Sequence, residues 1–235
     1  MVSSVGIRGD GNQMATQIKS RERVSFFGEV FTNEREVKAM CDLVDAEASR
    51  IESRVLEPAC GNGNFLVEIL TRKFKTIERL YKSQKEDFKK NSFIAISSLY
   101  GIDIIRDNVQ DCKDRLFEIW KTKIEMIPNF EKSLHGFDKS IKYVLDCNII
   151  CGDSLTMLTD NNTPIVFSEW SLLSGAFVKR RDFKLSTLIK VRENKEQGDL
   201  FLSSTKYDTE LGSYVPNPIK EYKPIEYWRL SEWQN

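Results

Sequence analysis

The stretch RVLEPACGNGNF at residues 54–65 decides the fold of this chain. Its first four residues are typical of a short strand, and Gly61 and Gly63 then mark a tight turn. Apolar residues recur at helical spacing from Phe65 to Phe74, which predicts a helix directly after the turn. A strand, a glycine turn and a helix open a βαβ unit, in which a ligand can reach bare backbone and the free N–H groups of the helix start.

Gly61 and Gly63 have a second explanation, because glycines after a first strand also let a helix and a strand pack closely. The pair alone leaves packing and ligand binding equally open. Asp103 stands at the end of the second expected strand and Asp153 follows the third, where carboxylates can accept hydrogen bonds from ribose hydroxyls or an exocyclic amino group. Each acid alone is better explained as a strand-end or helix-capping residue. The glycine turn and both acids, in order at three strand ends, favour a binding site.

Strands alternate with helices along the rest of the chain up to Trp170. Apolar periodicity predicts helices over residues 34–49, 65–98 and 105–119, and strands over residues 99–104, 148–151 and 165–167. This alternation predicts an α/β fold with a mainly parallel sheet and helices on both faces.

Composition excludes several classes of protein. The 235 residues carry 35 basic and 35 acidic side chains, and this balance argues against a histone-like basic protein without excluding a local nucleic-acid groove. We find no apolar run long enough to cross a membrane and no signal-peptide core, so the cytoplasm is the expected location. Cys147 and Cys151 lack zinc spacing, and His135 is the sole histidine, so no metal site is expected.

Four segments resemble, in order, motifs of the N6-adenine-specific DNA methyltransferases of restriction–modification systems. The segments are Gly28–Thr32, Glu57–Phe65, Gly101–Ile104 and Gly152–Leu155, and the resemblance covers about residues 24–157. It implies a Rossmann-like, S-adenosylmethionine-dependent methyltransferase fold, S-adenosylmethionine as cofactor and DNA as substrate. The missing third glycine and the distance of Asp103 from the turn disfavour a dinucleotide cofactor.

The resemblance also implies roles for the cofactor contacts. Phe31 and Thr32 would flank the methionine carboxylate beside the glycine turn, and Glu57 would face the methionine amino group. Asp103 would hold the ribose hydroxyls, with Ile104 against the adenine ring. Asp153 would accept from the adenine amino group, with Leu155 as an apolar wall. The full expected set is Phe31, Thr32, Glu57, Pro58, Ala59, Gly61, Gly63, Phe65, Asp103, Ile104, Asp153, Ser154 and Leu155.

The catalytic segment departs from the family, whose motif is a polar residue, two prolines and an aromatic residue after the fourth strand. Here residues 164–170 read PIVFSEW. Trp170 would stack on a flipped adenine, but Phe167 then stands where the polar residue belongs, and Ser168 or Glu169 would have to replace it. These four residues are the candidate catalytic group. An ordinary strand with a buried tryptophan explains the segment equally well.

The expected organisation is a flexible leader (residues 1–20), a cofactor-binding core (21–170), and remaining strands with an aromatic, proline-containing tail (171–235). The basic stretch Phe177–Lys184 is the best candidate for phosphate contact, although a solvated strand is at least as consistent with it. Because little chain remains for sequence recognition, a protein partner is expected to supply it.

Three functions stay open at this point. The first is an adenine-specific DNA methyltransferase, or a methyltransferase subunit, of a restriction–modification or defence system. The second is a catalytically degenerate module that binds the cofactor or DNA within a larger assembly. The third is a methyltransferase acting on small molecules or proteins.

Overall fold

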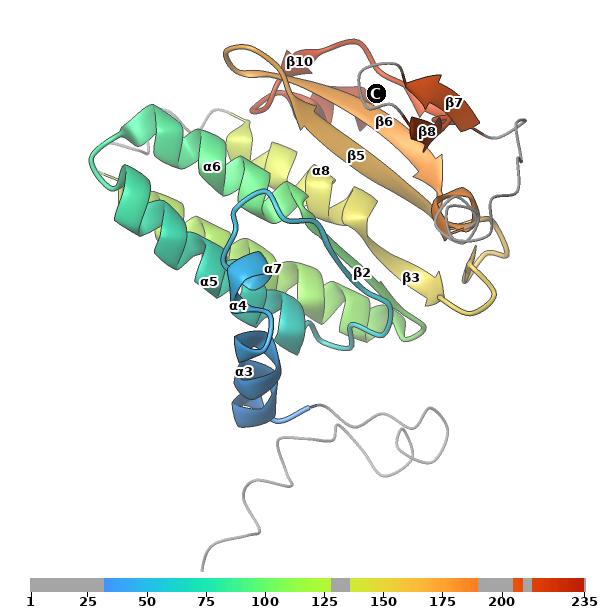
Figure 1. Cartoon of the computed structure of the whole chain (residues 1–235), viewed down its shortest axis with the longest axis horizontal. Coiled ribbons are helices and arrows are strands. Elements are labelled where there is room, and N and C mark those ends of the chain that lie inside the picture. Colours follow the sequence, from blue (N-terminus) through green and yellow to red (C-terminus); the bar gives the residue numbers. More distant parts are fainter. Residues whose placement is uncertain (1–31, 128–135, 190–204, 209–212, 235) are drawn as a thin grey trace, which may run out of the picture.

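The computed structural model describes residues 32–127, 136–189, 205–208 and 213–234. Figure 1 shows the helices gathered on one side of the molecule and the long strands β5 and β6 running together on the other. The expected leader (residues 1–20) and His135 lie outside the described residues.

Three short parallel strands form the centre of the chain. They are β1 (Val55–Glu57), β2 (Leu99–Asp103) and β3 (Ile149–Asp153), in the spatial order β1-β2-β3, and β4 (Leu158–Thr159) joins β3 antiparallel. Glu57 pairs with Gly101, and Gly101 with Ile149. The carboxyl ends of all three strands therefore meet at one edge of the sheet, which we call the strand-end edge. The fold is α/β with a parallel-containing sheet.

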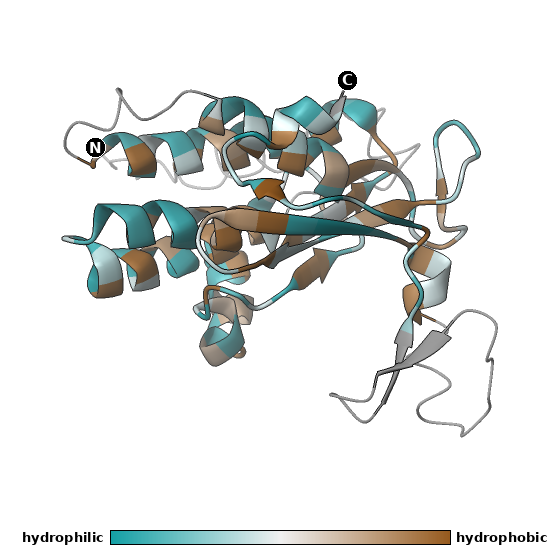
Figure 2. Ribbon diagram, turned by 90° about the horizontal axis from the view of Figure 1, so that it is seen from above, coloured by the Kyte–Doolittle hydropathy of each residue, from teal (hydrophilic) through white to brown (hydrophobic). Residues whose placement is uncertain are grey.

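The helices that accompany these strands are α3 (Glu34–Asp42), α4 (Asp45–Ala48), α5 (Asn64–Tyr81), α6 (Lys85–Ser97), α7 (Arg106–Glu125) and α8 (Phe137–Asn148). The single helix expected over residues 34–49 is wrong, because Val44 leaves the helical region at φ −126° and ψ 29°. The long helical stretch expected before Ser98 is two helices, α5 and α6, and α8 was not expected. Hydrophilic and hydrophobic bands alternate along the helices (Figure 2), as amphipathic packing requires.

The two faces of the parallel strands are covered differently. Helices α5 and α7 contact one face and share a buried core with Leu99. On the other face, Tyr100 and Ile102 pack with Phe167 of β5 and with Leu185, which begins a short helical segment over residues 185–189. Among the described residues, this face is covered by strand β5 and by that short helical segment, so the expected layer of helices is complete on one face only.

A second sheet is entirely antiparallel. Its strands are β5 (Val166–Leu172), β6 (Phe177–Lys184), β9 (Lys220–Glu221) and β10 (Ile225–Glu226); β7 (Thr205–Asp208) and β8 (Ser213–Pro216) pair separately, and a 3-10 helix, η2, spans Leu230–Gln234. The expectation of a mainly parallel sheet is thus wrong beyond β3. β5 turns back into β6 through a loop containing Gly175 at φ 72°, instead of joining the parallel strands. The expected boundary at residue 170 falls inside β5.

The described residues contain neither a membrane-spanning helix nor a cluster of metal-binding side chains. None of their helices has the length and apolar composition to cross a membrane. Their His, Cys, Asp and Glu side chains form no group that could hold a metal ion. All five cysteines are free thiols, with Cys41, Cys60 and Cys112 buried.

Candidate functional site

The glycine turn after β1 is pressed against α7. Gly61 and Gly63 have φ angles of 51° and 89°, in the left-handed region that favours glycine. A Cβ on Gly63 would lie 2.6 Å from the Cys112 Sγ, so a larger residue would also clash with α7. The Cys60 N–H donates to the Ile102 carbonyl at 2.8 Å and anchors the turn on β2. Close packing therefore accounts for Gly63 whether or not a ligand binds.

Asp103, at the end of β2, ties the same turn to the sheet. Its carboxylate accepts from the Gly61 N–H through Oδ2 and from the Ile105 N–H through Oδ1, both at 2.9 Å. The Asn108 Nδ2 lies 3.5 Å from Oδ1. A carboxylate has about four lone-pair sites, so capacity for a further donor remains. Asp103 therefore has the capping role expected of a strand-end acid, and its carboxylate can still accept a hydrogen bond from a ligand hydroxyl.

Arg115 on α7 joins the turn to the segment before α3. Its Nη1 donates to the Asn62 carbonyl at 2.7 Å and to the Asn64 Oδ1 at 2.8 Å. The Asn64 Nδ2 in turn donates to the Thr32 carbonyl at 3.0 Å. The structure thus brings Thr32 to the glycine turn, while Phe31 lies outside the described residues. Sequence reasoning missed Arg115, because it belongs to no motif and reaches the turn only through the packing of α7.

Two acceptors near the turn are suited to a ligand that donates hydrogen bonds. The Asn62 Oδ1 is buried and has no hydrogen-bond partner among the described residues. Burial raises the pKa of Glu57, and a hydrogen bond from the Ala59 backbone N–H partly offsets this. An orphaned buried acceptor costs about 1–3 kcal/mol. A ligand ammonium or N–H group at this point would relieve that cost.

Asp153 completes the strand-end edge at β3. Its Oδ1 accepts from the Leu155 N–H at 2.8 Å, which shapes the turn after the strand. The Leu155 side chain is 90% exposed, and Ile104, after β2, is 52% exposed. Glu57, Asp103 and Asp153 therefore share one edge with two apolar side chains that face solvent.

The remaining expected cofactor residues lie around the same turns. Pro58 and Ala59 are exposed between β1 and the glycine turn, and Ser154 is half-buried after β3. Phe65, in the first turn of α5, packs against the core as a half-buried residue. Phe65 therefore contacts the helix layer, and Pro58, Ala59 and Ser154 form the rim of the edge.

The candidate catalytic segment lies elsewhere. β5 begins beside the strand-end edge, where Ile165 lies close to Gly152. It runs back toward the opposite ends of the parallel strands, where Glu169 pairs with Arg54 just before β1. The Trp170 Nε1 donates to the Asn148 Oδ1 at 3.1 Å, and Asn148 immediately precedes β3. At about 3.3 Å per residue, the length of β3 separates Trp170 from Asp153 by roughly 15 Å.

Each side chain from Phe167 to Trp170 contacts other parts of the protein. Phe167 packs edge-on against Tyr100, with ring centroids 5.3 Å apart, and the Ser168 Oγ donates to the Asp182 Oδ1 at 2.8 Å. Glu169 forms ion pairs with Arg54 at 2.7 Å and with Arg181 at 2.5 Å. Trp170 is 8% exposed. This placement matches a strand with a buried tryptophan, and it gives Trp170 no free face for stacking on a base.

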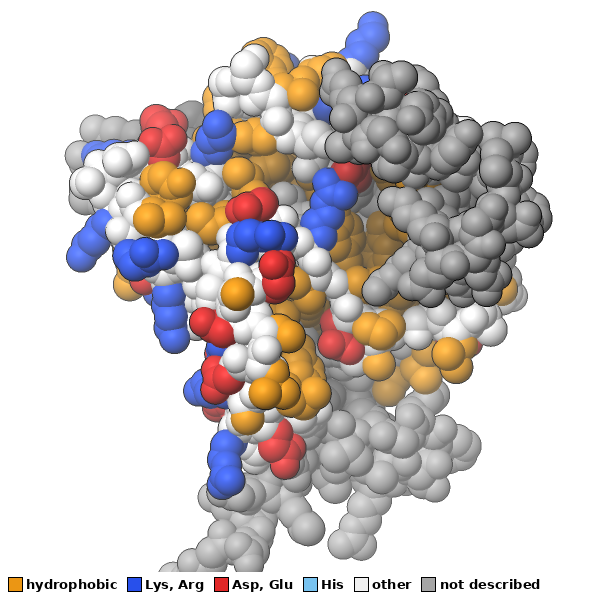
Figure 3. All heavy atoms as spheres, viewed as in Figure 1, with side chains coloured by type: hydrophobic (Ala, Val, Ile, Leu, Met, Phe, Trp, Pro, Cys, Tyr) orange, Lys and Arg blue, Asp and Glu red, His pale blue; other side chains and the backbone are white. Residues whose placement is uncertain are grey.

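The basic stretch on β6 is also engaged internally. Lys179 pairs with Glu221 at 2.6 Å, Arg181 pairs with Glu169, and Arg180 is buried against Asp182. Lys184 is exposed. Elsewhere on the face shown in Figure 3, Lys and Arg side chains lie interspersed with Asp and Glu. These contacts agree with neither expectation for Phe177–Lys184, because most of its charged side chains are paired within the protein and Arg180 is buried.

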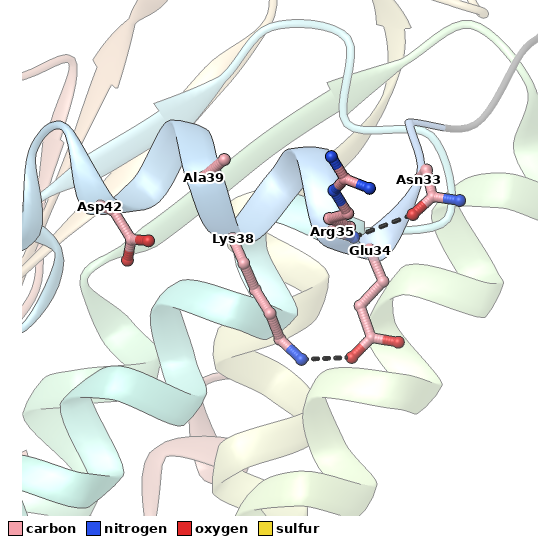
Figure 4. Close-up of a pocket in the computed structure, with 6 residues that line it drawn as sticks. All are labelled: Asn33, Glu34, Arg35, Lys38, Ala39 and Asp42. Atoms are coloured by element: carbon pink, nitrogen blue, oxygen red, sulfur yellow. Dashed lines mark hydrogen bonds and ion pairs between the residues drawn. The ribbon is translucent and has the colours of Figure 1, made fainter.

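Two hollows border α3. The first, of about 550 Å³, is lined by residues of α3 and by its N-cap Asn33 (Figure 4), and the Lys38–Glu34 ion pair at 2.6 Å lies within it. The second, of about 390 Å³, lies between α3 and α5 and includes Asn64 and Arg115 in its lining. Neither hollow is lined by Asp103 or Asp153, so both are separate from the strand-end edge.

Comparison with known proteins gives one partial match. No family model matches the chain, and no solved structure is significantly similar to it. A protein of Methanocaldococcus jannaschii named "Putative type II restriction enzyme and methyltransferase" is 29% identical over 112 residues, which are 46% of this chain and 9% of that protein. The chain therefore spans a small part of this relative's length. The similarity is distant and partial, and it points to a role related to restriction–modification methyltransferases.

Proposed function

We propose that this chain is the S-adenosylmethionine-binding part of an adenine-specific DNA methyltransferase in a restriction–modification or defence system. The observation that carries the proposal is the meeting of the glycine turn with Glu57, Asp103 and Asp153 at one edge of parallel strands. Open α/β sheets bind nucleotide-like ligands at this position. The order β1-β2-β3 is that of one half of a Rossmann-like sheet. The partial similarity to a restriction enzyme and methyltransferase supports the reaction class.

The residues at the edge fit the groups of this cofactor. Glu57 and the orphaned Asn62 Oδ1 would accept from the methionine ammonium. Asp103 would use its remaining acceptor capacity for the ribose hydroxyls. Asp153 would accept from the adenine amino group, between the exposed Ile104 and Leu155 side chains.

The cofactor, when bound, supplies an electrophilic methyl group for adenine N6. The chain's own part is to bind the cofactor and hold it in one orientation, with Arg115 and Asp103 fixing the shape of the turn beneath it. DNA is the proposed substrate. A protein partner in the same cytoplasmic assembly is proposed to recognise the DNA sequence.

A second candidate function is a catalytically degenerate module that binds the cofactor or DNA within a larger assembly. The placement of Phe167–Trp170 favours it, because this segment is packed into β5 away from the strand-end edge. On this alternative the isolated chain binds the cofactor and transfers nothing.

Two measurements test the proposal. Calorimetry with S-adenosylmethionine and S-adenosylhomocysteine should show binding by the purified chain. Transfer of a labelled methyl group to mixed-sequence DNA, with and without co-purified partner proteins, separates an active subunit from a degenerate module. Absence of binding to either compound would remove the assigned site.

A further inference from the structure

The corner where α5 turns into α6 carries an excess of positive charge. Residues 75–90 contain six basic and three acidic side chains. Two of the acids are already paired, Glu78 with Lys123 of α7 and Glu86 with Lys89. The excess lies in four exposed cations, which we call the basic corner: Lys75, Arg79, Lys82 and Lys85.

The cations of the basic corner point to solvent. None of the four forms an ion pair with another described residue. Lys75, Arg79 and Lys82 follow one another at helical spacing, so they form a stripe about 10 Å long on one side of α5. On the left of Figure 3, Lys and Arg side chains project from this end of the helices. The stripe is therefore open to a charged partner.

The stability of the two helices accounts for only part of this charge. A helix dipole favours cations in the last turn, which explains Arg79 and also Lys82 at the C-cap of α5. Lys75 precedes that turn, and the effect of the dipole falls off within it. Lys85 is the first residue of α6, where the dipole disfavours a cation. The basic corner thus has more positive charge than its helices need.

The basic corner is distant from the strand-end edge. α5 begins at Asn64 beside the glycine turn, and its 18 residues span about 27 Å, so the corner lies at the other end of the helix (Figure 1). The strand-end edge presents the carboxylates of Glu57, Asp103 and Asp153, whereas the corner presents cations. Because the whole chain has no net charge, a polyanion is attracted only by such a local excess.

We propose that the basic corner binds the phosphate backbone of duplex DNA, as a contact separate from the strand-end edge. The choice of DNA among polyanions rests on the proposed function. Phosphates of one DNA strand recur about every 3.4 Å along the helix axis, so the stripe on α5 spans about three of them. Exposed lysines carry a point charge on a flexible stem and suit contacts that do not depend on base sequence.

The test measures binding of the full chain to a mixed-sequence duplex of about 20 base pairs, by fluorescence anisotropy between about 50 and 200 mM salt. A variant combining Lys75→Gln, Arg79→Gln and Lys82→Gln should bind at least about tenfold more weakly at the lower salt. The slope of log affinity against log salt should become shallower by about 2.7, because three phosphate contacts are lost.

The matched control combines Lys121→Gln, Lys139→Gln and Lys223→Gln, which removes the same charge from exposed lysines elsewhere. It should keep the wild-type affinity and slope. Equal losses in the two triple variants would overturn the proposal, because overall charge would then explain binding. Failure of the wild type to bind the duplex would also overturn it.

A labelled polyglutamate peptide tests the other class of anionic partner. Binding of this peptide as tight as that of DNA, and lost in the Lys75/Arg79/Lys82 variant, would make an acidic polypeptide the partner and overturn the proposal. Should that variant fail to fold, Lys75→Gln and Lys85→Gln, on different helices, should each lower the salt slope by about 0.9. An unchanged slope in both would contradict the proposal.

Calorimetry with S-adenosylhomocysteine separates this inference from the proposed function. Both triple variants should bind this compound as the wild type does. Cofactor binding together with equal DNA binding by the two triple variants overturns the basic corner alone. DNA binding that depends on the corner, without cofactor binding by the wild type, overturns the proposed function instead.

Discussion

The strand-end edge and strand β5 differ in what their polar groups are free to do. At the edge, the Asn62 Oδ1 has no partner among the described residues, and Leu155 and Ile104 present apolar surface to solvent. In β5, the Ser168 Oγ and the Trp170 Nε1 have protein partners. Glu169 lies between two arginines, and its buried Oε2 forms an ion pair without a well-aligned hydrogen bond. The charge of Glu169 is therefore already compensated by the protein, whereas the neutral acceptor at the edge is open to a donor from a ligand.

The position of β5 is also costly to change. Asp182 on β6 receives the Ser168 hydroxyl and a two-point ion pair from Arg180, at 2.7 and 2.9 Å. The Arg180 guanidinium lies 4.4 Å from the centre of the Tyr222 ring. Both members of this ion pair lie on β6, and the Ser168 hydrogen bond joins β5 to them. A rearrangement that carried Trp170 to the strand-end edge would have to break this bond and the Trp170–Asn148 hydrogen bond.

Trp170→Ala should have the largest effect. If Trp170 belongs to the core, the variant loses about 3–5 kcal/mol of unfolding free energy, and the Asn148 Oδ1 loses its donor. Urea unfolding measures the loss. Trp233→Ala is the matched control, because this half-buried ring stacks on Trp170 and should cost less. A Trp170→Ala variant as stable as the wild type but defective in DNA binding would support stacking of Trp170 on a base. Strand β5 would then be a binding region like the strand-end edge.

Asp103→Ala should weaken S-adenosylhomocysteine binding tenfold to a hundredfold, or about 1.5–3 kcal/mol. Part of this loss comes from the turn, because the carboxylate also holds the Gly61 N–H.

Measuring two ligands on both proteins separates the contact of Asp103 with the ribose from its effect on the turn. The wild type should bind S-adenosylhomocysteine more tightly than its 2′-deoxy analogue, and Asp103→Ala should bind the two alike. An unchanged preference in the variant would show that Asp103 acts on the turn alone.

The buried Lys73 should make the free energy of unfolding depend on pH. It is fully buried on α5, where its Nζ donates to the Ser53 carbonyl and the Ser98 Oγ, both at 2.5 Å. Burial lowers the pKa of Lys73 to about 7, below its ordinary 10.5. Between these values the unfolded chain holds a proton that the folded chain lacks. Stability therefore rises as pH increases through this window, by at most about 1.4 kcal/mol per pH unit.

Urea unfolding at pH 7.0 and 8.5 should show a gain of up to about 2 kcal/mol for the wild type. Lys73→Met should lose this gain, whatever its absolute stability. The range stops at pH 8.5 because burial raises the pKa of Cys41 and Cys147, whose contribution to stability falls at higher pH. Equal slopes for the two proteins would mean that Lys73 stays protonated.

The sequence predicted what local chemistry controls. The turn at residues 60–64 follows from two glycines between a strand and a helix, and the order β1-β2-β3 places Asp103 and Asp153 where strand ends were expected. The path of β5 depends on partners distant in sequence, such as Asp182 and Asn148, and no short-range pattern in residues 164–170 encodes them. Arg115 was missed for the same reason.

Glu57 gives the smallest and most specific test of the strand-end edge. Burial raises the pKa of this carboxyl, and an ammonium group of the ligand needs the carboxylate in its charged form. Affinity for S-adenosylhomocysteine should therefore fall as pH decreases through that raised pKa, by at most about tenfold per pH unit.

Glu57→Gln should bind S-adenosylhomocysteine roughly tenfold more weakly than the wild type at pH 8, or about 1.4 kcal/mol. Its affinity should no longer depend on pH between 8 and 5. Calorimetry across that range measures both effects, and Glu52→Gln, an exposed acid before β1, is the control that should keep the wild-type profile. If Glu57→Gln retained the pH dependence, the titrating group would lie elsewhere, and the ammonium would have to be assigned to a different acceptor at this edge.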